Sequence, residues 1–345
     1  MGINSLIIAP QWIGDAVMTE PLMRRLQARG ERLTVGALPW VAPVYRAMPS
    51  VAEVVEFPFA HGGLQFAARR RIAEDFRKRG TTGKEPFDAA YVLPNSLKSA
   101  LLPLFAGIPK RIGYMGEARV GFLTHRLKNP TNKPPMVAFY SALSGEEHPK
   151  TGYQADIPQL ALNDVEVQTT LTELGLQRGN YVVFSPGAEF GSAKRWPAQH
   201  FVDLALKLDV PVVLLGSGKE FELCEAIANP VNAKQPNKCL NLAGKTSLAG
   251  AFAAISATKY VVSNDSGLMH VAAALGVPQV AIFGSSSPLH TPPLSAAARV
   301  LWLKNDPNYQ PALDCAPCFA RECEFSHTRC LRDISADLVL KTMET

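Results

Sequence analysis

The sequence predicts an α/β protein with two doubly wound domains that face each other across a cleft. Short apolar segments alternate with segments of helical periodicity along most of the 345 residues, which is the pattern of parallel sheets covered by helices. The alternation stops in a proline-rich stretch at residues 128–160 and then starts again. The length also suits two domains of ordinary size. We therefore expect an N-terminal domain at residues 1–160 and a C-terminal domain at residues 161–345.

Composition places the chain among globular proteins with a large core. Apolar residues make up 47% of the sequence and charged residues 19%. No apolar run approaches the ~20 residues that a membrane-spanning helix needs. The short apolar run at residues 6–9 has no basic patch before it, so it resembles a buried strand more than a signal peptide. We expect a cytoplasmic protein without a transmembrane segment.

Charge is distributed unevenly along the chain. Residues 1–150 contain 20 lysines and arginines against 12 aspartates and glutamates, whereas residues 151–345 contain 15 against 18. A basic first half suits an anionic partner or a membrane surface. The alternative is a solvated surface with no partner, and charge alone does not decide between the two.

The first half contains four predicted strands, at residues 3–9, 33–38, 54–57 and 89–93. Helical spacing predicts helices at residues 15–28 and, in a basic run, at residues 69–79. Lys110 and Arg111 precede a predicted glycine-containing turn that ends at Tyr114. A short helix is expected at residues 136–143, bracketed by prolines.

The second half again alternates predicted strands and helices. Predicted strands lie at residues 181–184, 211–215, 239–242, 260–263 and 280–283. Predicted helices lie at residues 200–207 and 248–255, and another begins at Glu220. The chain then ends in a cysteine-rich tail at residues 315–330 and a C-terminal helix. Ligands of such sheets bind at the carboxyl ends of the strands, so the turns that follow the strands are the places to look for a site.

One of these turns, residues 263–270, reads SNDSGLMH and joins a predicted strand to a predicted helix. Ser266 and Gly267 stand where the helix begins, and the unpaired N–H groups and the dipole of a helix start favour an anion such as a diphosphate. The alternative is that Asp265 and Ser266 only cap the helix.

Asp15 follows the first strand and opens the next helix. The turn before it, PQWIG, lacks the G-x-G-x-x-G pattern of a dinucleotide site. Asp15 can serve as a helix-start carboxylate, which the helix dipole favours. It can also serve as a general base that faces a cleft.

Several motifs carry a resemblance to a known family, in matching order along the chain. They are PQWIGD (10–15), LPNSLKSALLPLFAGIPKRIGY (93–114), SPGAEFGSAKRWP (185–197), LLGSGKE (214–220), NLAGKTSL (241–248) and NDSGLMHVAAALG (264–276). The chain resembles the ADP-heptose:lipopolysaccharide heptosyltransferases of glycosyltransferase family 9, which have the GT-B fold of two Rossmann-like domains. Two of these segments, PNSLKSAL (94–101) and PGAEFGSAKRWP (186–197), favour the type II members of the family. The short NDSG turn does not discriminate among members.

The resemblance implies an inverting transfer of heptose from ADP-heptose to the first inner-core heptose of a Kdo2-lipid A acceptor. It assigns the general base to Asp15. It assigns stabilisation of the leaving ADP to Lys194, to the backbone N–H groups of Ser266, Gly267 and Leu268, and to the nearby His270. It places Glu220 on the adenosine ribose and Asp265 at the turn or the donor sugar. Three of these assignments have a purely structural alternative: a surface cation for Lys194, a helix-start carboxylate for Glu220 and a packed core side chain for His270.

The acceptor carries phosphates and Kdo carboxylates, so basic residues of the first half are candidates to bind it. The candidates are Arg69, Arg70, Arg71, Lys98 and Arg111. The usual alternative for a run such as residues 69–79 is a solvated helix face. The alternatives to this function are another family 9 heptosyltransferase, of type I or III, and a binding module for nucleotide sugars without catalysis. No nucleic-acid partner is expected.

Four of the six cysteines gather in the tail, and they are Cys315, Cys318, Cys323 and Cys330. In a cytosolic protein this C-x2-C-x4-C-x6-C spacing suggests a structural zinc ion more than disulfides. An iron–sulfur centre and reduced free thiols are the alternatives. Cys224 and Cys239 are expected to be ordinary buried thiols. We expect no organic cofactor, and assistance by Mg²⁺ stays open.

Overall fold

The protein is described by a computed structural model, which covers residues 2–59, 63–145 and 156–344. The chain forms two compact units, Met1–Ala161 and Leu162–Thr345, called unit 1 and unit 2 below. No helix within the described ranges is long and apolar enough to cross a membrane.

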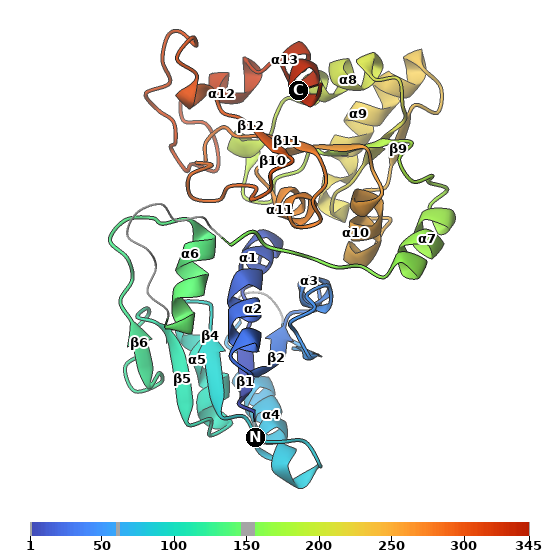
Figure 1. Cartoon of the computed structure of the whole chain (residues 1–345). Helices are drawn as coiled ribbons and strands as arrows, with labels where there is room; N and C mark the ends of the chain where they lie inside the picture. The colour runs from blue at the N-terminus through green and yellow to red at the C-terminus, as the bar shows by residue number, and fades with distance from the viewer. Residues whose placement is uncertain (1, 60–62, 146–155, 345) are drawn as a thin grey trace. The chain divides into compact units, whose positions relative to one another are not determined.

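Unit 1 is built on a six-stranded sheet in the order β3-β2-β1-β4-β5-β6 (Figure 1). All neighbouring strands are parallel. This order is that of a doubly wound, Rossmann-like sheet, in which the order reverses between β1 and β4. The strands are β1 (Asn4–Ile8), β2 (Arg32–Ala37), β3 (Glu53–Glu56), β4 (Ala89–Val92), β5 (Lys110–Tyr114) and β6 (His125–Leu127).

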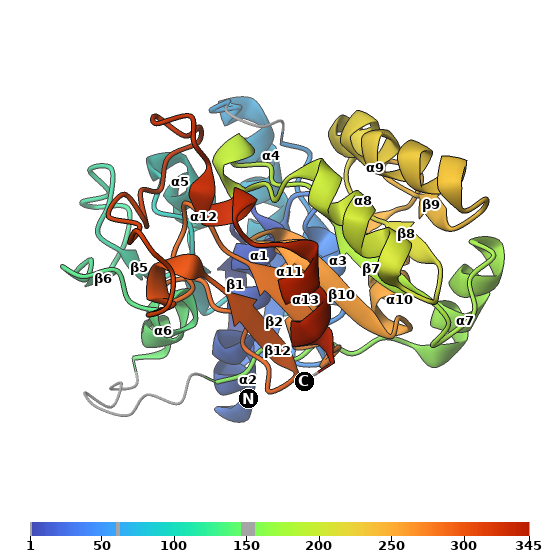
Figure 2. The same ribbon diagram turned by 90° about the horizontal axis from the view of Figure 1, so that it is seen from above.

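Helices cover both faces of this sheet. On one face α4 packs against α5, and on the other α2 and α6 pack together beside α1 and α3 (Figures 1 and 2). The helices are α1 (Ile13–Met18), α2 (Glu20–Ala28), α3 (Ala42–Arg46), α4 (Phe66–Arg77), α5 (Leu97–Phe105) and α6 (Met136–Ser141), with short 3-10 turns at η1 (Arg79–Thr81) and η2 (Ala142–Ser144). The apolar core on the α4 and α5 side joins strand residues such as Leu6 and Val92 to Phe76 and Leu102 of the helices.

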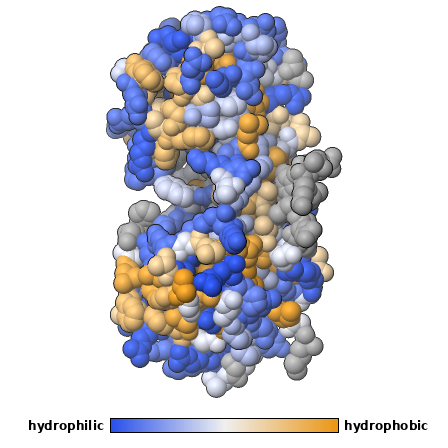
Figure 3. Space-filling model, turned by 90° about the vertical axis from the view of Figure 1, so that its left-hand side faces the viewer, coloured by the Kyte–Doolittle hydropathy of each residue, from blue (hydrophilic) through white to orange (hydrophobic). Residues whose placement is uncertain are grey.

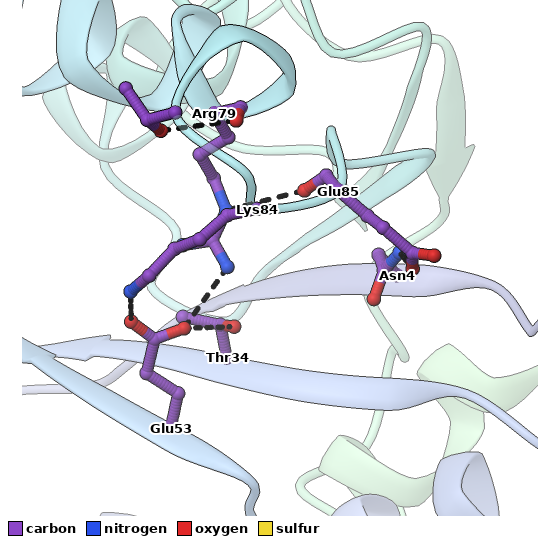
Figure 4. Close-up of polar contacts among 7 residues, drawn as sticks. Asn4, Thr34, Glu53, Arg79, Lys84 and Glu85 are labelled. Atoms are coloured by element: carbon purple, nitrogen blue, oxygen red, sulfur yellow. Dashed lines mark hydrogen bonds and ion pairs between the residues drawn. The ribbon is translucent and has the colours of Figure 1, made fainter.

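The segment after α4 is held to the sheet by a polar network around Glu53 of β3 (Figure 4). The Glu53 carboxylate accepts hydrogen bonds from Lys84 Nζ at 2.5 Å and from Arg79 Nη2 at 3.0 Å. Burial alone would raise the pKa of Glu53, but the hydrogen bonds from Lys84 and Arg79 outweigh it and hold the pKa below its ordinary value. Glu53 therefore stays ionised at neutral pH.

Unit 2 contains a second parallel sheet, in the order β12-β11-β10-β7-β8-β9. Counted from its own first strand, β7, this is the order found in unit 1, and it reverses between β7 and β10. The strands are β7 (Val182–Ser185), β8 (Val212–Leu214), β9 (Cys239–Asn241), β10 (Tyr260–Asn264), β11 (Gln279–Ile282) and β12 (Ala298–Leu301). The prediction of two parallel, doubly wound α/β sheets is confirmed.

The helices of unit 2 also cover two faces. In Figure 1, α8, α9 and α13 lie on one side of the sheet, and α10 and α11 lie on the other. The helices are α7 (Asp164–Glu173), α8 (Ala198–Lys207), α9 (Phe221–Lys234), α10 (Leu248–Ser256), α11 (Gly267–Ala274), α12 (Arg329–Arg332) and α13 (Ala336–Met343), with 3-10 turns at η3 (Ser192–Lys194), η4 (Gly218–Glu220) and η5 (Leu303–Asn305). The α8 side holds an apolar core in which Trp196 is fully buried and donates from Nε1 to Ile334 O at 2.8 Å.

Two predictions about local structure were wrong or incomplete, and some elements were not predicted. The turn expected to end at Tyr114 is strand β5, because Ile112, Gly113 and Tyr114 are buried between β4 and β6. The helix expected at residues 15–28 is two helices, and Pro21 lies in the first turn of the second. Strands β6 and β12 and helix α7 were not predicted.

The stretch at residues 128–160 is only partly a linker. Its helix, α6, is part of unit 1, where the ring of Phe139 stacks on Tyr114 with centroids 4.0 Å apart. Residues 146–155 of the expected linker lie outside the described residues.

Candidate active site

The predicted site residues follow the strands at which each sheet reverses its order. In unit 1, Asp15 comes shortly after β1 and Lys98 shortly after β4. In unit 2, the turn with Lys194 follows β7 and the turn with Asp265 follows β10. Ligands of doubly wound sheets bind at this reversal point, outside the carboxyl ends of the strands.

In unit 2 the structure brings together three predicted residues from two separate motifs. Lys194 Nζ lies 2.5 Å from Asp265 Oδ2, and the two side chains are 19% and 6% exposed. His270 is buried on α11 and interacts electrostatically with both. Burial lowers the pKa of His270 to about 4; Lys194 acts in the same direction, and Asp265 partly opposes them. His270 is therefore neutral at physiological pH, so Lys194 supplies the positive charge of this cluster.

The start of α11 is not closed by a side chain. Ser266 is the N-cap residue, but its side chain makes no capping hydrogen bond, and its buried Oγ has no hydrogen-bond partner among the described residues. The neighbouring Asp265 carboxylate is directed to Lys194 instead. The interpretation of Asp265 and Ser266 as mere helix caps is therefore wrong. The arrangement leaves an open helix start, which suits an anion.

Two further buried hydroxyls lie in the turn after the neighbouring strand, β11. The Oγ atoms of Ser285 and Ser286 have no hydrogen-bond partner within the described part of the chain. Buried polar groups are normally satisfied, so unpaired donors at the carboxyl end of a sheet are consistent with a polar ligand there.

Asn264 is a structural residue of this site that the sequence reasoning missed. Its buried side chain accepts a hydrogen bond from Trp196 N at 2.9 Å and donates one to Pro186 O at 2.6 Å. It therefore ties the end of β10 to both ends of the turn that carries Lys194. An asparagine at the end of an apolar strand was the available signal, because a polar side chain in that position needs partners.

Glu220 forms a capping box at η4 with Ser217. Its Oε2 atom accepts hydrogen bonds from Ser217 N at 2.7 Å and from Ser217 Oγ at 3.0 Å. The carboxylate also lies against Gly187, where a Cβ atom would come within 1.6 Å of Oε1. Glu220 thus has the predicted alternative role at a helix start, and its contact with ribose stays a prediction.

Asp15 lies in the first turn of α1 in unit 1, partly exposed. The buried Tyr140 of α6 hydrogen-bonds to the Asp15 carboxylate. Burial raises the pKa of Tyr140, and the negative charge of Asp15 raises it further, so the hydroxyl keeps its proton and acts as the donor. A carboxylate has lone pairs beyond the one that this bond uses, so it retains the capacity to accept a proton.

The predicted acceptor-binding cations of unit 1 fall into two groups. Arg69 and Lys98 line one cavity of about 40 Å³ at the carboxyl ends of the central strands, together with Gln11. Arg69 is largely buried, donates from Nε to Leu64 O at 2.7 Å and stacks over the Phe59 ring at 4.1 Å. Burial lowers the pKa of Arg69.

The other three are not gathered in that cavity. Arg70 is exposed and forms an ion pair with Glu74 at 3.3 Å, and Arg71 is also exposed. Arg111 donates to two backbone carbonyls, Phe122 O at 2.7 Å and Ile108 O at 2.6 Å. The solvated helix face predicted as the alternative fits Arg70 and Arg71, and the recorded contacts of Arg111 are structural.

The four tail cysteines line a single cavity of about 30 Å³ in unit 2, together with His327. All four are free thiols, and burial together with the neighbouring cysteines raises the pKa of Cys330 to about 11. No three His, Cys, Asp or Glu side chains in the described part of the chain are arranged to hold a metal ion. The thiols thus share a cavity, and metal binding by them stays a prediction. Cys224 and Cys239 are buried, as expected.

Comparison with known proteins identifies the family. The model of glycosyltransferase family 9 (heptosyltransferase) matches residues 77–328. Lipopolysaccharide heptosyltransferase 2 of Escherichia coli is 43% identical over 311 residues, which cover 86% of this chain and 87% of that protein. Lipooligosaccharide heptosyltransferase 2 of Haemophilus influenzae is 38% identical, and the match covers 87% of this chain and 89% of that protein.

The solved structure of E. coli ADP-heptose lipopolysaccharide heptosyltransferase II is similar over almost the full length. It superimposes with a TM-score of 0.82 at 38% identity, over 99% of this chain and 98% of that one. The chain has two parallel α/β units and closely matches this solved structure. It therefore has the GT-B fold expected from its motifs, and the protein is a glycosyltransferase. On the family match and the extent of this identity, the chain belongs to glycosyltransferase family 9, the heptosyltransferases.

Proposed function

We propose that this glycosyltransferase transfers L-glycero-D-manno-heptose from ADP-heptose to the first inner-core heptose of Kdo2-lipid A, with inversion at the anomeric carbon. The observation that carries the proposal is the cluster of Lys194, Asp265 and His270 beside the uncapped start of α11. The substrates are inferred from the relatives. These are named heptosyltransferase 2, and the match to this chain covers most of their length.

The donor is bound by unit 2. The diphosphate sits at the N-terminus of α11, where the N–H groups of Ser266, Gly267 and Leu268 and the helix dipole favour negative charge. Lys194 adds a cation from η3. As the glycosidic bond breaks, the bonding electron pair leaves with ADP, and preorganised donors of this kind stabilise the new charge on the β-phosphate. Glu220 accepts hydrogen bonds from the ribose hydroxyls.

Asp15 is the general base. An acceptor hydroxyl attacks the anomeric carbon from the face opposite the diphosphate, and the Asp15 carboxylate takes its proton. A single displacement of this kind inverts the anomeric configuration. The hydrogen bond from Tyr140 fixes the orientation of the carboxylate, which supports this role.

The acceptor is bound by unit 1. Arg69 and Lys98, which share a cavity, are the residues that we favour for its phosphate or carboxylate groups. The other three candidates are less favoured. Arg70 forms an ion pair with Glu74, Arg71 is exposed, and Arg111 donates to two backbone carbonyls.

We also propose that the enzyme works at the cytoplasmic surface of the inner membrane, because its acceptor is a lipid. Figure 3 shows apolar side chains gathered on one face of unit 1. Independently of that view, the segment from β5 to β6 exposes Met115 and Val120 by 43% and 69%. Met115 N donates to Leu127 O, which lies between the exposed cations Arg126 and Lys128. Apolar side chains beside cations suit an anionic lipid surface.

Product analysis tests the function directly. The purified enzyme is incubated with ADP-heptose and truncated lipopolysaccharides that carry no heptose or one heptose. We expect one heptose to be added to the acceptor that already carries one, and NMR of the product to show an inverted anomeric centre. Transfer only to the heptose-free acceptor would identify a type I enzyme instead, and retention of configuration would exclude the single displacement.

A further inference from the structure

The cysteine-rich loop, residues 315–330, packs directly on the turn that carries Lys194. Ala193 N donates a hydrogen bond to Arg321 O at 3.0 Å. At Gly191 the two backbones are so close that a Cβ atom would lie 2.2 Å from Arg321 O, so only glycine fits there. A second bond, from Phe319 N to Ser285 O at 2.7 Å, attaches the loop to the turn after β11. The loop therefore has a defined position beside the donor cluster.

This packing places a second cation on the same aromatic ring as Lys194. The Arg321 guanidinium lies 5.0 Å from the ring centre of Phe190, and Lys194 Nζ lies 5.3 Å from the same ring centre. Aromatic rings attract cations to their faces, so Phe190 can hold both groups in place. Arg321 is an exposed residue. Within the described residues its guanidinium contacts the ring of Phe190.

The charge of the donor cluster leaves a role for a second cation. Lys194 is paired with Asp265 at 2.5 Å, so these two side chains together carry no net charge. His270 is neutral at physiological pH. The two phosphates of a nucleotide sugar carry about two negative charges, and the leaving nucleoside diphosphate carries more. The helix start contributes only about half a positive charge, so the described cluster alone leaves the diphosphate short of positive charge.

We propose that Arg321 is a second cation of the diphosphate site, delivered to it by the cysteine-rich loop. This inference rests on the proposed function, in which Lys194 and α11 bind the diphosphate. It gives the loop a place in donor binding that its cysteine spacing does not suggest. Guanidinium suits the role because its planar set of donors matches phosphate oxygens. The competing interpretation is a surface arginine that only stacks on Phe190.

Calorimetric binding of ADP and of adenosine to the full-length protein tests the proposal. The variants are Arg321→Gln and Arg321→Lys, which leave the backbone carbonyl that holds Ala193 in place. The matched control is Lys259→Gln, which removes one exposed positive charge at the amino end of β10, the opposite edge of the sheet.

We expect Arg321→Gln to raise the Kd for ADP about tenfold, as the loss of a charge-assisted hydrogen bond predicts. Arg321→Lys should recover part of this loss, adenosine binding should not change, and Lys259→Gln should bind ADP like the wild type. Unchanged ADP affinity in Arg321→Gln, with weakened affinity in Lys194→Met, would overturn the role of Arg321 alone. Unchanged affinity in Lys194→Met as well would overturn the proposed donor site itself.

Discussion

Replacing Lys194 by methionine should separate the two tasks of this side chain, which are to neutralise Asp265 and to bind the donor. Methionine keeps the length of the side chain and removes the charge. The partner carboxylate, 6% exposed, is then left without its cation. Exposed ion pairs contribute about 0–1 kcal/mol, and breaking a buried pair costs about 3–5 kcal/mol. Because Lys194 is 19% exposed, we expect Lys194→Met to lower the free energy of unfolding by about 2–4 kcal/mol.

The double variant Lys194→Met/Asp265→Asn distinguishes stability from function. It removes both charges, so it should recover most of the lost stability, because no unpaired carboxylate remains buried. It should not recover ADP affinity, because the cation is still missing. Urea unfolding gives the free energies, and calorimetry gives the affinities. A single variant as stable as the wild type would refute the reasoning on the ion pair, and ADP affinity restored in the double variant would refute Lys194 as a phosphate ligand.

Three further predictions address other parts of the molecule. Asp15→Asn should keep the affinity for ADP and lose turnover by at least about 100-fold, as expected for loss of a general base. A binding-only protein would retain full function. Normal turnover of Asp15→Asn in a heptose-transfer assay would therefore exclude Asp15 as the general base. The pKa of Glu53 is lowered in the folded state from its ordinary value of 4.5, so its contribution to stability is present above that value and is lost as the pH falls through the folded pKa. The stability difference between wild type and Glu53→Gln, from urea unfolding, should therefore shrink from pH 7 to pH 3, and a constant difference would contradict the network of Figure 4. If the four tail cysteines hold structural zinc, protein purified without chelator should contain about one zinc ion per chain by mass spectrometry. Cys330→Ser should lose this zinc, and Cys224→Ala should keep it. A metal-free wild type with four titratable tail thiols would favour the alternative of free thiols.

The fold class was predictable because buried parallel strands leave a strong signal. Segments such as β8, whose three residues are all buried and all apolar, stand out from their surroundings. Strand β5 was mistaken for a turn because it begins with Lys110 and Arg111 and contains a glycine. The edge strand β12 was missed because half-exposed edges lack the apolar run that identifies a central strand.

The site was predictable in part, because its residues come from turns at strand ends. Motif order pointed to Lys194, Asp265 and His270, and the structure gathers them. Tyr140 and Arg321 could not be found in this way, since each reaches its neighbour through packing between distant segments. Arg321 meets the Lys194 turn only because the backbone at Gly191 allows a close approach, and sequence spacing carries no sign of that contact.

The chain passes from unit 1 to unit 2 once, after Ala161, and each sheet uses strands from its own unit only. The final strand of the first sheet, β6, ends at Leu127. During translation the ribosome therefore releases all six strands of the first sheet before it makes any strand of the second. Domains usually fold as units during synthesis, N-terminal first. The nascent N-terminal half can thus bury its apolar surface early, which limits its exposure to aggregation while the remaining half is still being made.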